Sequence, residues 1–255
     1  MITGDFHTHG SFSHGKGSAY KNAEQAHKKG MKSLAITEHG LFILAGGLSA
    51  KEITDARKEF DDAQMAFPEV KMYFGVEADL ISPDGEVDLP KKYQDVFDVV
   101  LLGMHYFVKG TRFRNIVWIV WQNLFRIFIR NRKRLKEINT RALCKAMQRY
   151  RIDALSHLGT SMPDYDIVQV AKVAEETDTC IELNNKHRSL SLDQLVYLAS
   201  TGVKYLLASD AHEPEDVGSV DYMLELALKA GINPEKILNL DKIYIPKKFR
   251  EATEA

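Results

Sequence analysis

Asp5-Phe6-His7-Thr8-His9 closes the first β-rich run of the chain, which we expect to span Ile2 to His7. Alternate residues of a strand face the same way, so the imidazoles of His7 and His9 can bind one ion. A single HxH pair carries little weight, because two histidines one residue apart recur by chance. Its weight comes from the rest of the chain, where ionisable residues follow other strands in the same manner.

Six further apolar runs alternate with helical patterns, which is typical of βα units around a parallel sheet. Runs such as Val99-Val100-Leu101-Leu102 suit strands that are buried on both faces. Seven strand–helix units in 255 residues predict a single α/β domain, a closed or nearly closed barrel. The other expected strands are 33–37, 71–78, 97–104, 152–157, 179–184 and 203–209, and the expected helices include 50–65, 166–177 and 220–230.

Most histidines of the chain fall at the carboxyl ends of these strands. In a parallel barrel those ends open onto one face, so distant residues converge there. One histidine at a strand end is usually structural or exposed, but so many at one kind of position need a common cause, because burying ionisable groups without partners is costly. We therefore expect a metal cluster with the ligands His7, His9, His14, His39, Glu77, His105, His157, Asp210 and His212, whereas His27 and His187 fall elsewhere.

The number of ligands sets the number of ions. A catalytic zinc takes about three protein ligands and a water, so nine ligands suit three ions. Glu77 is the natural bridge, because the two oxygens of a carboxylate reach two metals ~3.5–4 Å apart. A site rich in imidazole favours zinc, with manganese or iron as alternatives, over magnesium or calcium.

The composition is that of a globular protein, with 45% hydrophobic and 27% charged residues, and it excludes a collagen-like or disordered chain. Cys144 and Cys180 lie far apart without a CxxC motif, which argues against a disulfide framework or a cysteine zinc site. No signal peptide precedes the first strand, so we expect a cytoplasmic protein.

One segment is strongly basic and aromatic. Residues 109–151 hold 13 Lys and Arg against one acid, although the net charge of the whole chain is −1. Within it, the apolar run 116–129 is too short for a membrane span of ~20 residues. We expect a helical insertion that packs on the barrel or pairs two copies through residues 116–149. A lid, peripheral attachment to an anionic membrane and nucleic-acid contact are the alternatives, and the acidic remainder argues against a stable nucleic-acid partner.

The constellation resembles the PHP (polymerase and histidinol phosphatase) family of metal-dependent phosphoesterases. The resemblance implies a distorted (βα)7 TIM-like barrel over residues 1–245, with the insertion at about 109–151 and a C-terminal tail at 246–255. It rests on the motifs Asp5-Phe6-His7-Thr8-His9, Thr37-Glu38-His39-Gly40, Gly75-Val76-Glu77-Ala78, Gly103-Met104-His105, Ser156-His157, Glu182-Leu183-Asn184-Asn185 and Ser209-Asp210-Ala211-His212.

Histidine at position 14, where many family members carry Asp, resembles the small bacterial phosphatases with three metal ions. Glu38 stands where Asp is commoner, and we expect it behind the ligands rather than among them. By the family pattern, His7, His9, Glu77 and Asp210 hold one ion, Glu77, His105 and His157 hold a second, and His14, His39 and His212 hold a third.

Three divalent ions outweigh two ligand carboxylates, so the site favours an anionic substrate such as a phosphomonoester. A metal-activated water would attack phosphorus, with Asp210 orienting that water and Glu77 spanning two ions. Histidinol phosphate is one candidate substrate. Lys16, Lys186 and Arg188 are the candidate phosphate-binding residues, and His187 is expected to face the substrate or solvent.

Three other functions compete with this one. A nuclease or nucleotide phosphatase is the alternative within the hydrolases. An amidohydrolase typically needs a bridging lysine on strand four, where this chain has His105. A non-catalytic metal-dependent binding module would show lost ligands, and none of the nine is lost.

Overall fold

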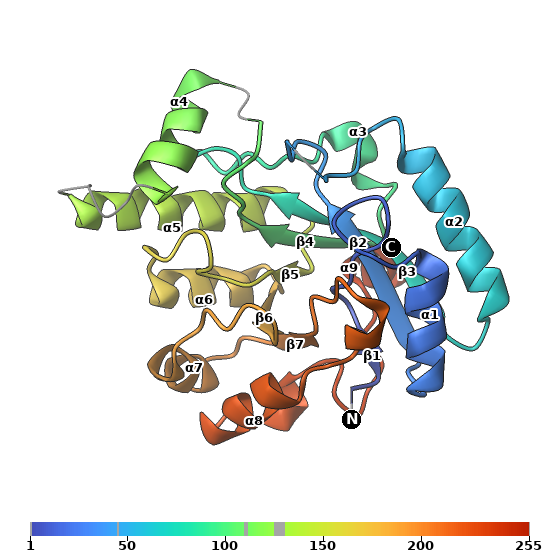
Figure 1. The fold of residues 1–255 in the computed structure, drawn as a ribbon. Coiled ribbons are helices and arrows are strands. Elements are labelled where there is room, and N and C mark those ends of the chain that lie inside the picture. Colours follow the sequence, from blue (N-terminus) through green and yellow to red (C-terminus); the bar gives the residue numbers. More distant parts are fainter. Residues whose placement is uncertain (1, 45, 110–111, 125–130, 255) are drawn as a thin grey trace.

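Seven parallel strands in sequence order form one sheet that curls into a nearly closed barrel (Figure 1). The structure, a computed structural model, describes residues 2–44, 46–109, 112–124 and 131–254. The predicted single-domain α/β barrel is confirmed. The strands are β1 (Gly4–Asp5), β2 (Ser33–His39), β3 (Lys71–Asp79), β4 (Val99–Gly103), β5 (Ala154–Leu155), β6 (Cys180–Asn184) and β7 (Tyr205–Ala208).

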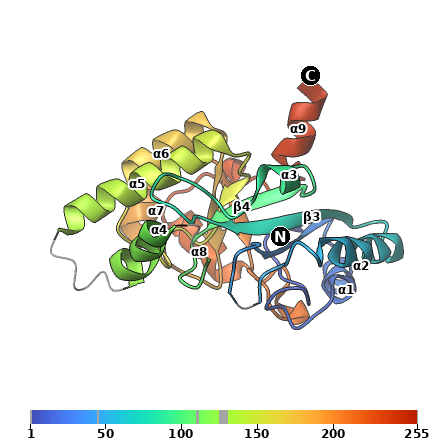
Figure 2. The same ribbon diagram turned by 90° about the horizontal axis from the view of Figure 1, so that it is seen from above.

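Helices cover the outside of the barrel. In Figure 1, α1 and α2 lie together on one flank, and α5 and α6 lie on the other. Figure 2 shows α9 beside α3, where Lys248 Nζ donates to the Asp95 carbonyl at 2.8 Å. The helices are α1 (Ala19–Lys28), α2 (Ile53–Ala66), α3 (Lys91–Gln94), α4 (Phe113–Ile116), α5 (Arg132–Arg149), α6 (Ile167–Glu176), α7 (Leu192–Ala199), α8 (Asp221–Lys229) and α9 (Lys247–Glu254), with a π-helix η1 (Val117–Leu124) and 3-10 turns η3 (Pro214–Asp216) and η4 (Pro234–Lys236).

The strands are apolar on both faces because both faces are buried. One face packs against the helices, as where the ring of Phe74 in β3 meets Phe60 of α2 at 5.5 Å between centroids. The other face fills the barrel, where Tyr73 and Leu101 cluster with Tyr244 from the C-terminal segment. This filled interior leaves the carboxyl ends of the strands as the place for a site.

A seam remains between β1 and β7, which do not pair as strands along their length. One bridge, Thr8 with Ala211, joins the chain just beyond them. Below that bridge the buried side chain of Asn239 connects the two strands. Its amide donates to the carbonyls of Gly4 at 2.8 Å and Leu207 at 2.7 Å, and its oxygen accepts the Leu207 N–H at 2.9 Å.

Strands β1 and β5 fall furthest short of the predicted ranges, and β4, β6 and β7 are shorter by one to three residues. Strand β1 ends at Asp5, not His7, because hydrogen bonds to side chains replace the ladder there, such as Thr8 Oγ1 to the Ala35 carbonyl at 2.7 Å. Strand β5 ends at Leu155 because His157 has a positive φ of 27° and donates its N–H to Glu182 Oε2 at 2.6 Å. In both strands the predicted ligands therefore stand on the irregular backbone just past the ladder.

The basic insertion forms α4, η1 and α5 against the barrel. Trp118 and Ile119 are buried in the main core, and the indole N–H of Trp118 donates to Asn139 Oδ1 at 2.9 Å. This favours the packing interpretation of the segment, although residues 125–130 of the apolar run lie outside the described residues. Within the described parts, no helix is both long and apolar enough to span a membrane.

Candidate metal centre

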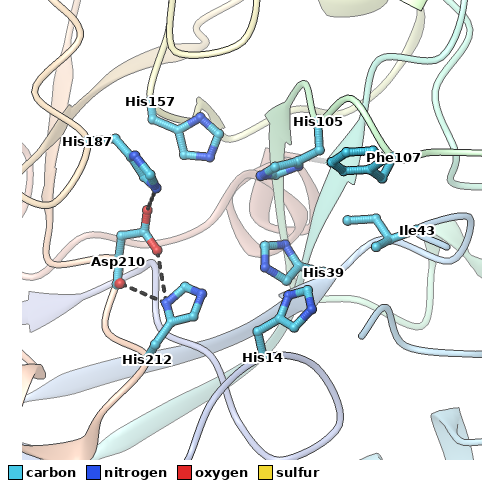
Figure 3. Close-up of a pocket in the computed structure, with 9 residues that line it drawn as sticks. All are labelled: His14, His39, Ile43, His105, Phe107, His157, His187, Asp210 and His212. Carbon is cyan, nitrogen blue, oxygen red and sulfur yellow. Dashed lines mark hydrogen bonds and ion pairs between the residues drawn. The ribbon is translucent and has the colours of Figure 1, made fainter. Parts of the chain in front are cut away.

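The barrel brings all nine predicted ligands to the carboxyl ends of its strands. Six of them line a cavity of about 360 Å³ together with His187, Ile43 and Phe107 (Figure 3). The other three, His7, His9 and Glu77, are buried. Residues that were far apart in the sequence thus share one cavity.

His7 and His9 meet Asp210 at one point of this cluster. Their Nε2 atoms lie 3.1 Å apart, and Asp210 Oδ1 lies 3.5 Å from His9 Nε2 and 3.9 Å from His7 Nε2. On the far side of its ring, His7 Nδ1 lies 2.6 Å from Glu182 Oε1. Because Glu182 accepts the Nδ1–H, Nε2 is the nitrogen of His7 that faces the cluster, where it would bind an ion once deprotonated.

Glu77 is the hub of the cluster. Its Oε1 lies 2.7 Å from His157 Nε2 and accepts from Ser156 Oγ at 2.8 Å. Its Oε2 lies 2.9 Å from His39 Nδ1 and 3.4 Å from His7 Nε2. Each carboxylate oxygen therefore faces a different set of imidazoles.

The donors fit divalent ions. Glu77 Oε2 and His39 Nδ1 are buried and close together, yet neither has a hydrogen-bond partner among the described residues. Buried polar atoms without partners are costly, and a cation between them satisfies both. Three groups of three donors have ligand atoms within 4.8 Å of one another: His7, His9 and Asp210; His9, His39 and His212; and His39, Glu77 and His105. Imidazoles with carboxylates form a donor set typical of zinc, manganese or iron.

Burial and neighbouring charges shift the pKa values of the clustered residues, in opposite directions for His7 and Glu77. Burial lowers the pKa of His7, but the carboxylates of Glu182, Asp210 and Glu77 outweigh it and hold that pKa well above its usual value. His9 has the reverse outcome, since burial and the neighbouring His39 lower its pKa. Burial raises the pKa of Glu77, yet the histidines around it bring that pKa well below the usual range.

His105 is held by Asp79, a residue that the sequence analysis did not single out. Asp79 Oδ1 accepts the backbone N–H of His105 at 2.7 Å and lies 2.8 Å from its Nδ1. Burial lowers the pKa of His105, but Asp79 and Glu77 raise it to about 10. The pairing orients the ring so that its other nitrogen is left for the cavity.

His14 and His212 differ in how closely they join the cluster. His212 belongs to a donor group with His9 and His39, whereas His14 is exposed and belongs to none of the three groups. The ring of His14 lies 5.1 Å from that of His39 and packs on the loop at Gly46, where an added Cβ would lie 2.2 Å from His14 Nε2. The structure thus places His39 nearer to Glu77 and His9 than to its expected partner His14.

The three predicted phosphate-binding cations do not share one place. Lys186 does not itself line the cavity but contacts two residues that do, with Nζ 2.7 Å from His212 Nδ1 and 3.6 Å from Asp210 Oδ1. Lys16 is exposed and pairs with Glu213, and Arg188 stacks 3.7 Å from the ring centroid of Tyr222; neither lines the cavity. His187 does line it, with Nε2 3.6 Å from Asp210 Oδ2.

Supporting residues behind the ligands were missed, although two of them carry a recognisable signal. Asp79 follows Glu77 by two residues in β3, and Asn184 follows Glu182 by two in β6. Residues two apart on a strand share a face, so each pair was readable from the sequence. Asn184 donates to both Glu182 Oε2 at 2.9 Å and Asp210 Oδ2 at 3.1 Å.

Two predicted ligands have left-handed backbone. His157 has φ 27° and Asp210 has φ 55°. Such conformations cost free energy for residues other than glycine and persist where the surroundings impose them, often at functional sites. Here they turn both side chains back towards the cavity just past the strand ends.

A parallel barrel whose strand ends gather imidazoles and carboxylates defines a barrel metalloenzyme. The family model of the PHP domain matches residues 5–187, and the chain belongs to the PHP domain family.

Individual relatives agree with this family. A probable phosphatase of Thermoanaerobacter sp. strain X514 is 27% identical over 97% of this chain and 96% of that protein. The DNA polymerase/3'-5' exonuclease PolX of Bacillus subtilis strain 168 is 27% identical over 94% of this chain but only 39% of its own length. Histidinol phosphate phosphatase of Lactococcus lactis, solved with zinc, L-histidinol and phosphate, matches with a TM-score of 0.59 at 15% identity over 91% of this chain and 95% of that one. This last likeness shows the shared fold.

Proposed function

We propose that this chain, a metal-dependent phosphoesterase, hydrolyses a small phosphomonoester with the help of three divalent ions, zinc first and manganese or iron as alternatives. The observation that carries the proposal is the arrangement around Glu77, in which one oxygen faces His157 and the other faces His39. Phosphatase relatives that match nearly the whole chain support the reaction class. Three donor groups within one cluster support the number of ions.

When bound, such ions neutralise phosphoryl charge and lower the pKa of a coordinated water. The chain's own residues supply the rest. Asp210, fixed by the Asn184 amide, has an oxygen directed at the cluster and is placed to orient the attacking water. Lys186 and His187 stand on the same side of the cavity and are placed to bind phosphoryl oxygens.

Hydrolysis assays combined with metal analysis test this function. The protein is loaded with zinc, manganese or iron in turn and assayed with p-nitrophenyl phosphate, histidinol phosphate and a short oligonucleotide. We expect about three ions per chain, turnover of a phosphomonoester, and loss of both in Glu77→Gln. Turnover of the oligonucleotide alone would favour the nuclease alternative, and tight binding of phosphate esters without hydrolysis would favour a binding module.

Two finer expectations remain predictions. Pairing of two copies through residues 116–149 predicts a dimer by light scattering, and a monomer at all concentrations would exclude it. A cytoplasmic location predicts that a fluorescent fusion fills the cell, and no enrichment at the membrane is expected.

A further inference from the structure

Opposite the phosphate-binding side, the cavity has an apolar wall made of Ile43 and Phe107 (Figure 3). Phe107 is 70% exposed, and it lies at the mouth of a cavity otherwise lined by histidines and one carboxylate. An exposed large apolar side chain that lines a polar cavity indicates a contact surface for an apolar part of a ligand. No part of the hydrolytic chemistry proposed above uses these two residues.

The apolar wall is built on a fixed support. The loops after β2 and β4 join as a short antiparallel ribbon, in which Leu44 N–H donates to the Phe107 carbonyl at 2.9 Å and Lys109 N–H donates to the Phe42 carbonyl at 2.8 Å. Asp88 anchors the ribbon by accepting the Phe42 N–H at 3.1 Å, and its other oxygen accepts the Asp79 N–H at 2.7 Å.

Asp79 also holds His105, so the wall and a predicted metal ligand share one scaffold. The position of the apolar wall relative to His105 is therefore held by this chain of hydrogen bonds.

The charges around the cavity disfavour a cationic substrate. Asp210 is the one carboxylate among the described residues that line it, and it lies in the metal cluster. Lys186 adds a positive charge nearby, and positions 45, 110–111 and 125–130, which lie outside the described residues, hold no Asp or Glu in the sequence. An ammonium group beyond the phosphate would meet no counter-charge there and would be repelled by the bound ions.

Resting on the proposed function, we infer that Ile43 and Phe107 select phosphomonoesters whose alcohol part is uncharged and apolar or aromatic. The phosphate binds at the ions, and the alcohol part lies on the two apolar side chains. This preference sets the chain apart from phosphatases of cationic amino alcohols, histidinol phosphate among their substrates.

Two phosphates of primary alcohols test the preference without changing the leaving-group chemistry. The metal-loaded enzyme is assayed with 2-phenylethyl phosphate and 2-aminoethyl phosphate. Binding of the two matching phosphonates, which cannot be hydrolysed, is measured by calorimetry. We expect the phenyl compound to be preferred about tenfold or more in both measurements, since burial and aromatic contact of one ring are worth roughly 1.4 kcal/mol.

Variants assign the preference to the wall. Phe107→Ala is expected to lower the ratio of kcat/KM for the two substrates about tenfold, and Ile43→Ala to lower it by a smaller factor. Phe113→Ala is the matched control, because Phe113 is 81% exposed and does not line the cavity, and it should leave the ratio unchanged. Circular dichroism and thermal melting check that each variant is folded.

The possible failures are distinguishable. Hydrolysis with no preference for the phenyl compound, or a preference that Phe107→Ala leaves intact, overturns this inference and leaves the proposed function standing. Phosphonate binding that prefers the phenyl compound and depends on Phe107, without hydrolysis of any phosphomonoester, overturns the proposed function but supports the apolar wall. Absence of both binding and hydrolysis overturns both.

Discussion

Glu182 positions two of the predicted ligands, His7 and His157, with one carboxylate. One oxygen lies 2.6 Å from His7 Nδ1, and the other accepts the backbone N–H of His157 at 2.6 Å. The first contact fixes the tautomer of an imidazole, and the second holds a strained backbone turn. A carboxylate that supports ligands in this way contributes to metal affinity without binding the metal itself.

Replacing Glu182 should therefore weaken metal binding more than folding. We expect Glu182→Gln to lower the affinity for zinc by about 10–100-fold. The carboxylate accepts from His7, His157 and Asn184, whereas an amide has one accepting oxygen and places an N–H₂ donor where the other carboxylate oxygen accepts. Competition with a chromophoric chelator measures the affinity. Glu235→Gln, at an exposed position, is the control, and equal affinities in the two variants would contradict the assigned role.

The two cysteines are expected to be unreactive in the folded protein. Burial raises the pKa of Cys144 to about 11 and that of Cys180 to about 12, so both thiols stay protonated at pH 8. The thiolate is the reactive form. Iodoacetamide at pH 8 should thus alkylate the native protein far more slowly than the urea-unfolded protein, as followed by mass spectrometry. Fast labelling of either thiol in the native state would refute this.

Among the elements, the strands were predictable and their last residues were not. The apolar runs located β2, β3 and β4 because each strand is buried on both faces. The ends of β1 and β5 were placed too late, since their ladders stop where side-chain hydrogen bonds and a left-handed residue take over. The hydrophobic pattern of a sequence indicates which residues are buried. It does not show where side-chain hydrogen bonds replace the backbone hydrogen bonds between strands.

For the candidate site, likewise, the residues could be predicted from the sequence but their contacts with one another could not. The candidate ligands, Glu77 among them, could be brought together from the sequence because their type and position at strand ends are unusual, and the structure places them in one cluster. Which residue faces which neighbour depends on tertiary geometry. His39 thus lies against Glu77, whereas the family pattern groups it with His14 and His212. The turn of Arg188 towards Tyr222 likewise depends on a helix that is distant in sequence.

The packing of the insertion on the barrel should depend strongly on the buried indole of Trp118. Trp118 is buried, and its N–H bonds to Asn139 of α5. Trp118→Ala is expected to destabilise the protein by about 3–5 kcal/mol, the range for large-to-small changes in a core. Urea unfolding measures the change, with Phe113→Ala expected to stay within about 0.5 kcal/mol of the parent. An effect below 1 kcal/mol for Trp118→Ala would show that the segment is loosely attached.

At the scale of the whole barrel, the three side-chain hydrogen bonds of Asn239 should contribute to the free energy of unfolding. Asn239→Leu leaves the Gly4 carbonyl and both backbone groups of Leu207 without their partner. We expect a loss of about 3 kcal/mol or more in unfolding free energy, because each unsatisfied buried group costs about 1–3 kcal/mol. Gln148→Leu, on the exposed face of α5, serves as the control in the same urea titration.

Metal removal should lower the stability of the entire molecule. Ions that bind only the folded chain stabilise it by mass action, by about 2.7 kcal/mol at a hundredfold excess over the dissociation constant. For a chain of this size that corresponds to a melting temperature about 5–10 °C lower after chelation. Calorimetric scans with and without chelator test this, and identical scans would mean that the cluster folds without ions.

The seam between β1 and β7 has a consequence for motion. Its two lips carry His7 and His9 on one side and Asp210 on the other, so one donor group spans the gap that no strand ladder crosses. A cation held by that group would link the two edges of the seam at the carboxyl ends of the strands, while Asn239 links them below that point. After chelation, deuterium uptake should accordingly increase first at the amides that flank this gap. The seam would then open more readily than any pair of hydrogen-bonded strands.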